Sequence, residues 1–450
     1  MPAGLDNGTE GRNPFNNPSH VRPVDACKDT LQAAAGSLVI RITPKGPLKD
    51  DGGLAFTAGA CVYLPPGYAD SGLAYPVLYL LHGGGGDEAD WVTYGGIRSI
   101  MDEAVVADAA SAAIVVMPDG TDGQWYDALD GSVQNQRYLF DFLIPYVERH
   151  FRTIAARDGR AVDGLSNGGY GAAHFAAKAP DRFVAAGTMS ANLAALTFDG
   201  LAQATAPAYF HGSLPIDLAT NLDGVDLVMD IGTECITDKT RDNCLAFQFE
   251  QIFVPANRDF SARLAAVRGA DDGVLDYREG EGAHSWNWWP LWLRQHQLPF
   301  LLARLADPRP AEPPAPVGTP RPSFRYRSVS ASFSVWGYDV NVTRDVREFF
   351  DLSAVTRDGM VVQGSGRATI RTAARYTPGD RYWVTGAGTD TQDVTADVDG
   401  RIAFDVDLGP SHAFEQFTPE ATAAENAGDY WVVRTIAIAP APITSVEAGR

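Results

Sequence analysis

The stretch Gly164-Leu165-Ser166-Asn167-Gly168-Gly169 decides the fold of this chain. Residues 160–163 before it favour a short buried strand, and the small residues 170–178 after it favour a helix. A serine on a sharp turn between a strand and a helix is a nucleophile elbow, in which larger flanking side chains would collide. The stretch therefore predicts that Ser166 is a nucleophile. The rest of the chain is then expected to supply a histidine, an acid and an oxyanion hole.

Length and charge limit the classes of function. The chain has 450 residues, enough for two domains, and a formal net charge of −20. This charge argues against a nucleic-acid partner, which needs a basic face, and against docking on an anionic membrane. The most apolar region, 104–117, is interrupted by Asp108, so we expect no membrane insertion.

The organisation of residues 26–306 predicts an α/β domain. A tail at 1–25 is polar and rich in Gly, Asn and Pro. Beyond it, apolar runs such as 75–81 suit strands that are covered on both faces. They alternate with helical patterns at 97–107, 137–150, 246–267 and 291–305. This alternation predicts a mostly parallel sheet with helices on both faces.

A second domain is expected after a proline-rich linker. Residues 307–322 contain seven prolines, a composition typical of an extended spacer. Residues 323–450 then show short strand patterns between Gly, Asp and Pro turns, with almost no helical periodicity. They predict a C-terminal, all-β, sandwich-like domain.

The four cysteines are expected to form two disulfides. The favoured pairs are Cys27–Cys61, which lie beside neighbouring predicted strands, and Cys235–Cys244, which close a short loop. Two disulfides are typical of an oxidising compartment, so we expect a secreted protein whose signal peptide is not part of this sequence. No cysteine pair has zinc-ligand spacing, and we expect neither a metal nor another cofactor.

The base is predicted to be His284. The serine hydroxyl is a weak nucleophile unless a base takes its proton. In hydrolases with an elbow the base follows the acid, near the C-terminal end of the domain. Among eight histidines, His284 follows the expected strand 274–277 and precedes the last helix, which places it on a loop.

The acid is expected just after the predicted strand 226–231. Glu234 is the favoured candidate and Asp238 is the alternative. Asp230 lies within the strand and is expected to point elsewhere. A Cys235–Cys244 bridge would stiffen this loop, as a site that must hold an acid still requires.

The oxyanion hole needs two backbone N–H groups directed at the developing negative charge. One is expected from Asn167, directly after the nucleophile. The other is expected from the loop His82-Gly83-Gly84-Gly85-Gly86, at Gly84, because glycine lets the backbone approach a substrate closely. Among the nearby aromatic residues, Trp125 and Trp286 are the favoured substrate-binding side chains because they lie on predicted loops at the same edge.

These residues together resemble the esterase-D-like branch of the α/β-hydrolases, which includes feruloyl and acetylxylan esterases and the antigen 85 mycolyltransferases. The resemblance covers about residues 59–305. It rests on Val62-Tyr63-Leu64-Pro65-Pro66-Gly67-Tyr68, Leu80-Leu81-His82-Gly83-Gly84 and the Ser166 elbow. A further pair of stretches, 272–277 and 284–289, is most similar to the antigen 85 members. It implies the same roles for Ser166 and His284 and for the two oxyanion N–H groups. Esterase members place the acid where this chain has Cys235, and the antigen 85 pattern places it nearer Asp238, so this choice stays open.

Two activities follow as hypotheses. The first is a secreted serine esterase that hydrolyses carbohydrate- or polymer-linked acyl esters through an acyl-enzyme. The alternative is an acyltransferase of the mycolyltransferase type, which passes the acyl group to a sugar hydroxyl. The four-glycine loop differs from the transferase version and favours the hydrolase.

Overall fold

The structure, a computed structural model, describes residues 27, 36–42, 59–120, 123–196, 198–235, 244–269, 273–313, 320–428 and 430–442. The expected tail at 1–25 and the alternative acid Asp238 lie outside these residues. The chain divides into two compact units. The α/β unit comprises Met1–Leu201 and Ser213–Ala315, and the β unit comprises Ala202–Gly212 and Pro316–Arg450.

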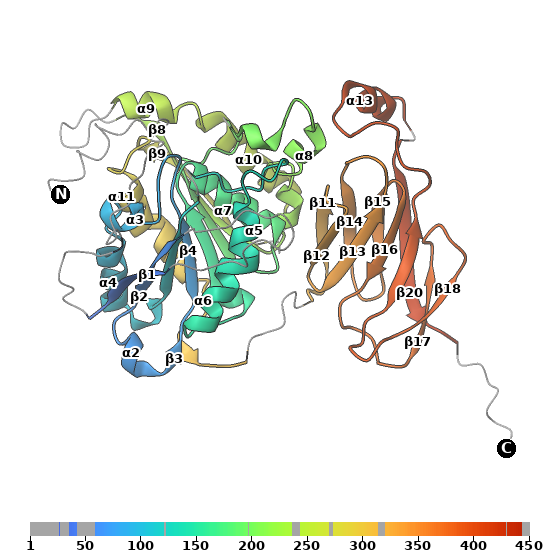
Figure 1. Ribbon diagram of the computed structural model, residues 1–450, viewed down its shortest axis with the longest axis horizontal. Helices are drawn as coiled ribbons and strands as arrows, with labels where there is room; N and C mark the ends of the chain where they lie inside the picture. The colour runs from blue at the N-terminus through green and yellow to red at the C-terminus, as the bar shows by residue number, and fades with distance from the viewer. Residues whose placement is uncertain are drawn as a thin grey trace, which may run out of the picture. The chain divides into compact units, whose positions relative to one another are not determined.

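The α/β unit is built on a mostly parallel sheet (Figure 1). Its strand order in the described chain is β1-β2-β5-β4-β6-β7-β8-β9. The β1–β2 and β2–β5 pairs are antiparallel, and every later pair is parallel. The bounds are β1 Leu38–Ile42, β2 Ala60–Leu64, β4 Val77–Leu81, β5 Ile114–Pro118, β6 Arg160–Gly164, β7 Ala185–Met189, β8 Asp226–Glu234 and β9 Leu275–Glu281. The predicted α/β fold class is confirmed.

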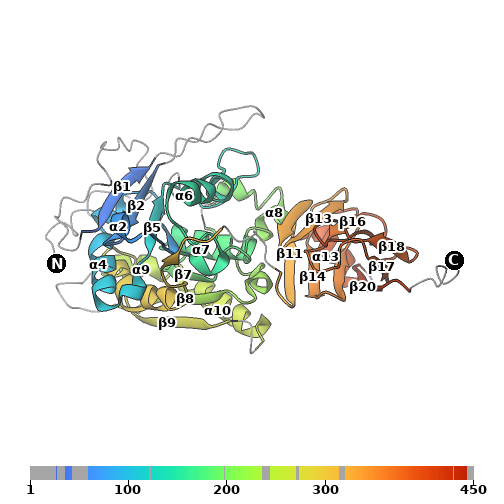
Figure 2. The same cartoon turned by 90° about the horizontal axis from the view of Figure 1, so that it is seen from below.

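Helices cover both faces of this sheet, with α4 on one side and α6 and α7 on the other (Figure 2). Apolar residues of α4 and of the segment from α11 to α12 share one buried cluster with the strands. The bounds are α2 Tyr68–Ser71, α3 Asp90–Thr93, α4 Ile97–Ala107, α5 Asn135–Arg137, α6 Ile144–His150, α7 Asn167–Lys178, α9 Cys244–Glu250, α10 Val254–Val267, α11 Trp289–Trp292 and α12 Leu298–Leu302. None of the described helices is long and apolar enough to cross a membrane.

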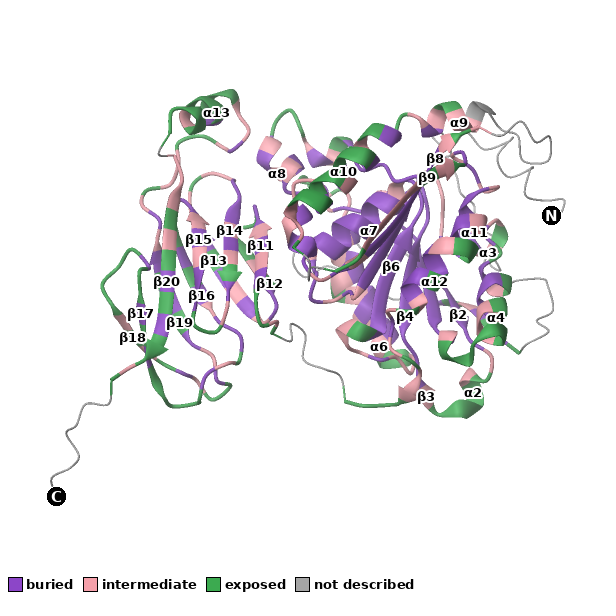
Figure 3. Cartoon of the chain, turned by 180° about the vertical axis from the view of Figure 1, so that it is seen from behind, coloured by how far each residue is buried: buried purple, intermediate pink, exposed green. Residues whose placement is uncertain are grey.

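The central strands are buried on both faces, as their uninterrupted apolar runs require. Every residue of β4, β5 and β6 is buried, and Figure 3 shows β4 and β6 covered along their length. A parallel strand between two helical layers has no solvent face, so it does not alternate in polarity. β6 nevertheless carries two buried ionisable side chains: Arg160, which pairs with Glu148, and Asp163.

Two predicted helices are interrupted, and proline explains where. The expected helix 291–305 contains a π-helical turn, Leu293–Gln297, directly before α12, whose second residue is Pro299. A similar π-helical turn, Tyr138–Leu143, precedes α6, which has Pro145 at the same position. Proline lacks an N–H, so the regular helical hydrogen bond is lost one turn earlier.

The predicted helix 246–267 is likewise two helices, α9 and α10, separated by residues 251–253. Pro255 lies in the first turn of α10, where a missing N–H is tolerated. This break ends α9 at Glu250, which proves important for the site.

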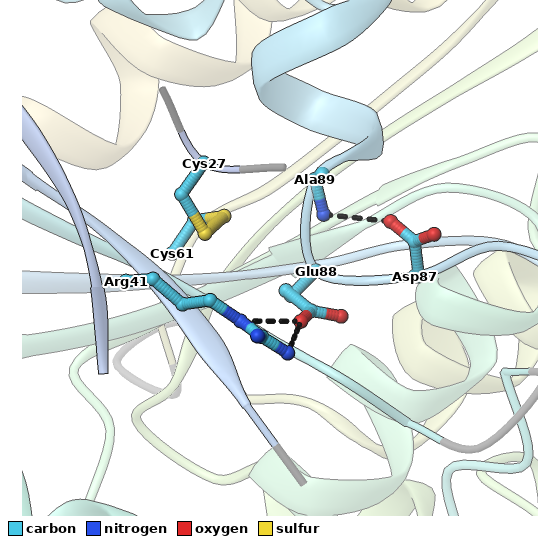
Figure 4. Close-up of a disulfide and its surroundings, with 6 residues drawn as sticks. All are labelled: Cys27, Arg41, Cys61, Asp87, Glu88 and Ala89. Carbon is cyan, nitrogen blue, oxygen red and sulfur yellow. Dashed lines mark hydrogen bonds and ion pairs between the residues drawn. A yellow bond between two sulfur atoms is a disulfide. The ribbon is translucent and has the colours of Figure 1, made fainter. Parts of the chain in front are cut away.

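The predicted Cys27–Cys61 disulfide is present and joins Cys27 to β2 (Figure 4). Beside it, the guanidinium of Arg41 on β1 donates to the buried carboxylate of Glu88 at 2.7 Å. Cys235 is also disulfide-bonded, whereas the side chain of its predicted partner, Cys244, lies outside the described part.

The β unit is an antiparallel sandwich, as the sequence predicted. Its described strands form one six-stranded sheet, β11-β14-β15-β20-β17-β18, and one four-stranded sheet, β12-β13-β16-β19. Along β20, from Val432 to Ala439, buried or partly buried residues alternate with exposed ones (Figure 3). The bounds are β11 Phe324–Ser328, β12 Ser332–Val335, β13 Tyr338–Thr343, β14 Phe350–Val355, β15 Gly359–Gly364, β16 Arg367–Arg371, β17 Arg381–Thr385, β18 Gln392–Thr395, β19 Ala403–Asp407 and β20 Val432–Pro440.

Two features of the organisation differ from expectation. The start of the proline-rich linker is not a free spacer, because Arg309–Pro310 (β10) pairs with Leu73–Ala74 (β3). The β unit also includes a segment from the middle of the chain, Ala202–Gly212, which contains α8 (Pro207–His211). Helix α13, Pro419–Asn426, belongs to the same unit.

Candidate active site

Ser166 occupies the strained turn that the sequence predicts. It lies between β6 and α7 with φ 55° and ψ −119°, a conformation that few non-glycine residues adopt. The flanking glycines are needed because the backbone is crowded. A Cβ on Gly164 would lie 2.4 Å from the backbone of Gly168, and one on Gly168 would lie 2.5 Å from the carbonyl oxygen of Leu81.

His284 lies within hydrogen-bond distance of this serine. Its Nε2 is 2.9 Å from the Oγ of Ser166. The imidazole is surrounded by aromatic rings: Phe253 stacks on it at 4.9 Å, and Phe249 and Trp289 present edges at 4.9 and 5.1 Å. The predicted pair of Ser166 and His284 is thus brought together across 118 residues of sequence.

The carboxylate beside His284 is that of Glu250, which the sequence did not predict. Its Oε2 lies 2.8 Å from His284 Nδ1, and the side chain is fully buried. Glu234, the favoured acid, is exposed at the end of β8, and Asp238 lies outside the described residues. The expectation that Glu234 would contact the imidazole is wrong because Glu250, at the end of α9, occupies that position.

Glu250 is held by groups from three parts of the sheet edge. Its Oε1 accepts hydrogen bonds from Ser190 Oγ at 2.8 Å and from the backbone N–H of Gly232 at 2.9 Å. Ser190, with φ 50°, also accepts a hydrogen bond from Trp289 Nε1 at 3.0 Å. One sequence signal could have identified Glu250, since it is the single charged residue in the apolar run 244–254.

The residues expected to form the oxyanion hole are Asn167, directly after Ser166, and Gly84. Asn167 is the first residue of α7, so its N–H has no acceptor within the helix. The loop that contains Gly84 passes close to the nucleophile: a Cβ on the preceding residue, Gly83, would lie 3.2 Å from Ser166 Cβ.

This glycine loop is held from behind by His82 and Trp125. The N–H of Gly120 donates to His82 Nε2 at 2.9 Å, so the proton of the neutral ring lies on Nδ1, which donates to the carbonyl oxygen of Gly83. Trp125 Nε1 donates to the carbonyl oxygen of His82 at 2.9 Å. The loop is therefore fixed before any substrate binds.

Trp125 does not line a surface, contrary to prediction. Its side chain is fully buried, packed against His82 and Phe175. Trp286, the other predicted substrate-binding residue, is partly exposed and contacts Trp91 at 5.1 Å and Trp289 at 5.2 Å. The sequence can place a residue on a loop near Ser166, but it does not show whether the side chain is exposed or packs beneath the loop.

Comparison with known proteins identifies the family. The model of the esterase family, described as "Putative esterase", matches residues 57–300. The chain belongs to this family. An esterase of Mycobacterium tuberculosis (strain ATCC 25618 / H37Rv) is 41% identical over 143 residues, which make up 30% of this chain and 30% of that protein. The endo-1,4-beta-xylanase/feruloyl esterase of Xylanibacter ruminicola is 34% identical over 131 residues, 28% of this chain and 18% of that protein.

This chain also shows a likeness to solved structures. A ferulic acid esterase is 23% identical with a TM-score of 0.48, and the likeness covers 60% of this chain and 99% of that one. MPT51 of Mycobacterium tuberculosis is 20% identical with a TM-score of 0.44 and the same two coverages. The match to the curated relatives thus spans less than a third of each of them.

The site carries the groups that ester hydrolysis uses. A hydroxyl, an imidazole and a carboxylate follow one another at 2.9 and 2.8 Å. Among the described residues, no group of three or more His, Cys, Asp or Glu side chains could hold a metal ion.

A second buried carboxyl lies beneath the elbow. Asp163, the residue before Gly164, is fully buried, and its Oδ1 accepts the Gly164 N–H at 2.7 Å. Desolvation by burial, with the nearby charge of Asp230, raises the pKa of this carboxyl well above its usual value. Within the described structure, Asp163 Oδ2 and Gln297 Oε1 both lack a hydrogen-bond partner.

Proposed function

We propose that the esterase cleaves its substrate through a triad of Ser166, His284 and Glu250. The observation that carries the proposal is the continuous chain of contacts from Ser166 Oγ through His284 to the buried Glu250 carboxylate. An ionised carboxylate only accepts hydrogen bonds, so it fixes the imidazole proton on Nδ1. The lone pair of Nε2 is then available to take the hydroxyl proton.

The reaction proceeds in two steps. Ser166 Oγ attacks the ester carbonyl while His284 takes its proton, and His284 then protonates the leaving alcohol to leave an acyl-enzyme. The N–H groups of Asn167 and Gly84 stabilise the negative oxygen of the tetrahedral intermediate. Water, activated by His284, hydrolyses the acyl-enzyme.

We propose that the substrate is an acyl ester linked to a carbohydrate or another polymer. The support is the feruloyl esterase among the relatives, together with the partly exposed Trp286, which contacts Trp289, a ring packed against His284. An aromatic side chain at this place gives an apolar surface on which an acyl group or a sugar ring can stack. The disulfides at Cys27–Cys61 and at Cys235 support secretion into an oxidising compartment.

Two matched substitutions test the acid. Glu250→Gln keeps the shape of the side chain, and we expect kcat for a p-nitrophenyl ester to fall about 10³- to 10⁴-fold because the imidazole loses its orienting charge. Glu234→Gln removes the same charge from an exposed position and should leave kcat within about twofold. Equal losses in the two variants would contradict the assignment of Glu250.

Ser166→Ala tests the nucleophile itself. We expect a loss of about 10⁴-fold or more in kcat, with binding preserved, because only the attacking oxygen is removed. A variant that still turned over at the wild-type rate would exclude this site as the origin of the esterase activity.

Acyl transfer to a sugar hydroxyl is the alternative fate of the same acyl-enzyme. The product ratio, measured with a feruloyl ester in the presence and absence of trehalose or glycerol, separates the two. If neither acceptor yields a new ester, the site hydrolyses only.

A further inference from the structure

The orientation of one buried amide, Asn192, is fixed by the turn that it closes. Asn192 is 3% exposed and lies in the loop that follows β7. Its Oδ1 accepts the Leu196 N–H at 3.0 Å, and its Nδ2 donates to the Leu196 carbonyl oxygen at 2.9 Å. A backbone N–H can only donate and a carbonyl oxygen can only accept. The oxygen and the nitrogen of the Asn192 amide therefore cannot exchange places.

This orientation determines that of a neighbouring amide, Asn167. The second N–H of Asn192 Nδ2 donates to Asn167 Oδ1 at 3.0 Å. The atom of Asn167 that faces Asn192 must therefore be its oxygen, and its NH2 group must point away from Asn192. Within the described chain, Asn167 Nδ2 has no acceptor, and it is in contact with solvent. An unpartnered donor thus lies on the residue directly after Ser166.

The turn that orients these amides is attached to the elbow itself. The Asn192 N–H donates to the carbonyl oxygen of Ser166 at 3.0 Å. On its other side, the fully buried Asn257 of α10 donates through Nδ2 to the Ala191 carbonyl oxygen at 2.8 Å. Ala195 has φ 52°, a conformation that costs alanine free energy and persists only where the surroundings fix the backbone. The unpartnered NH2 group is therefore held in place before a substrate binds, which reduces the entropy lost on binding.

Donors that lie deeper in the site are already used by the protein. Ser190 Oγ donates to the carboxylate of Glu250, and Trp289 Nε1 donates to Ser190 Oγ. Both groups therefore serve to hold the proposed acid. By contrast, nothing in the described structure accepts a hydrogen bond from the Asn167 NH2 group, so this group is available to a bound molecule.

We propose that the Asn167 side chain determines substrate specificity by donating a hydrogen bond from Nδ2 to an oxygen atom of the acyl group. Asn192 is its positioning residue and does not touch substrate. The substrate class is an ester whose acyl chain carries a hydroxyl or ether oxygen close to the ester carbonyl. This inference rests on the proposed esterase function and deepens it.

The position of Asn167 assigns the contact to the acyl side of the ester. Its backbone N–H is proposed to hold the carbonyl oxygen, and His284 is proposed to protonate the leaving alcohol. The alcohol oxygen must then face His284 Nε2. No contact in the described structure joins the Asn167 side chain to that imidazole. The side chain is therefore assigned to the acyl group, which extends from the carbonyl carbon away from the leaving alcohol.

Two p-nitrophenyl esters isolate this hydrogen bond. Methoxyacetate and butanoate have acyl chains of the same length, and they differ by an ether oxygen in place of one methylene. The quantity measured is the kcat/KM of the methoxyacetate divided by that of the butanoate, for the full chain and each variant. Comparing this ratio between proteins cancels the intrinsic reactivity of each ester and any general loss of activity. A neutral hydrogen bond accounts for about a two- to tenfold change in the ratio.

Three substitutions remove or reverse the donor. Asn167→Asp keeps the acceptor for Asn192 and replaces only the NH2 group, and Asn167→Leu removes the whole amide without adding a charge. We expect the ratio to fall about two- to tenfold in both. Asn192→Asp still accepts from Leu196 but cannot donate to Asn167. The Asn167 amide then turns over, donates to the new carboxylate and presents Oδ1 to the substrate, so the ratio should fall here as well.

Gln295→Leu is the matched control. It removes an exposed amide from the π-helical turn before α12, and this amide takes part in none of the contacts above. Its ratio should equal that of the wild type. An unchanged ratio in both Asn167 variants would overturn the proposal, and so would an equal fall in Gln295→Leu. If Asn167→Leu does not fold, Asn167→Asp carries the test, because it keeps the hydrogen bond from Asn192.

The same assay separates this inference from the function on which it rests. Turnover that persists in Ser166→Ala would refute the proposed function. Turnover that is lost in Ser166→Ala, together with a wild-type ratio in Asn167→Asp, would refute the role of the Asn167 side chain alone.

Discussion

Asp163→Asn is predicted to make the α/β unit more stable at neutral pH, although it removes a hydrogen-bonded charge-bearing group. Asp163 is fully buried beneath the elbow, and burial raises the pKa of its carboxyl well above the usual value. A Cβ on Gly187 would lie 2.4 Å from Gln297 Oε1 and 2.6 Å from Asp163 Oδ1, so both side chains border Gly187, and each has one oxygen without a partner. A protonated Asp163 can donate to Gln297, and asparagine can do the same with its amide.

The direction of the pH effect on stability follows from the linkage between proton binding and folding. A carboxyl whose folded pKa is raised contributes stability that is fully present below its unfolded pKa, about 3.9, and is lost as pH rises toward the folded pKa. Over that window, folding takes up one proton, and stability falls by about 1.4 kcal/mol per pH unit. Asparagine takes up no proton. Relative to wild type, Asp163→Asn should therefore gain stability as the pH rises from about 3.9 toward the folded pKa, by about 1.4 kcal/mol per pH unit.

Urea unfolding of both proteins at pH 5, 6 and 7 measures this difference, followed through the transition of the α/β unit. Asp230, His296 and Arg278 also lie in or near this network, but both proteins contain them, so their own titration largely cancels. Asp70→Asn, at an exposed position of α2, controls for the loss of one negative charge. Parallel stability curves for wild type and Asp163→Asn, or a relative loss with rising pH, would refute the assignment of a proton to Asp163.

Three further substitutions probe the site. Ser190→Ala removes one donor to Glu250 and leaves Trp289 Nε1 unpaired, so kcat should fall about tenfold, a barrier increase of about 1.4 kcal/mol, with KM little changed. Gly168→Ala would place a methyl group 2.5 Å from backbone oxygens of β4 and the glycine loop, and we expect lost activity together with an altered near-ultraviolet circular dichroism spectrum. Trp125→Phe keeps the buried ring but leaves the carbonyl oxygen of His82 without this donor, which should cost about 1–3 kcal/mol in urea unfolding. If any one of these variants behaves like the wild type, the contact that its substitution changes does not have the role stated here.

Sequence alone singled out Ser166 and His284, which the structure brings to 2.9 Å from one another, because their signals are local. The glycines around Ser166 form a short contiguous motif, and His284 lies on a short loop between a strand and the last helix. The order of strands and helices followed from apolar runs and periodicity for the same reason. Trp125 was misjudged because its exposure depends on Phe175 and on the glycine loop, which are distant in sequence.

The middle of the chain shows a similar limit. The residues 202–212 contain no unusual composition, and nothing in them indicates that they pack with a domain that begins more than a hundred residues later. The requirement for glycine at 212 is set by Val329, so it becomes visible only in the folded chain.

The carboxylate beside His284 is the clearest example of a site residue that the sequence pattern did not reveal. A carboxylate directly after a strand would meet the imidazole by the shortest route, but Glu250 reaches it from the last residue of α9, where the helix dipole disfavours a negative charge. That cost is offset because three donors converge on the carboxylate: Ser190 Oγ, the Gly232 N–H and His284 Nδ1. These donors come from the end of β7, from β8 and from the loop after β9, so only the assembled sheet edge makes this position favourable for an acid.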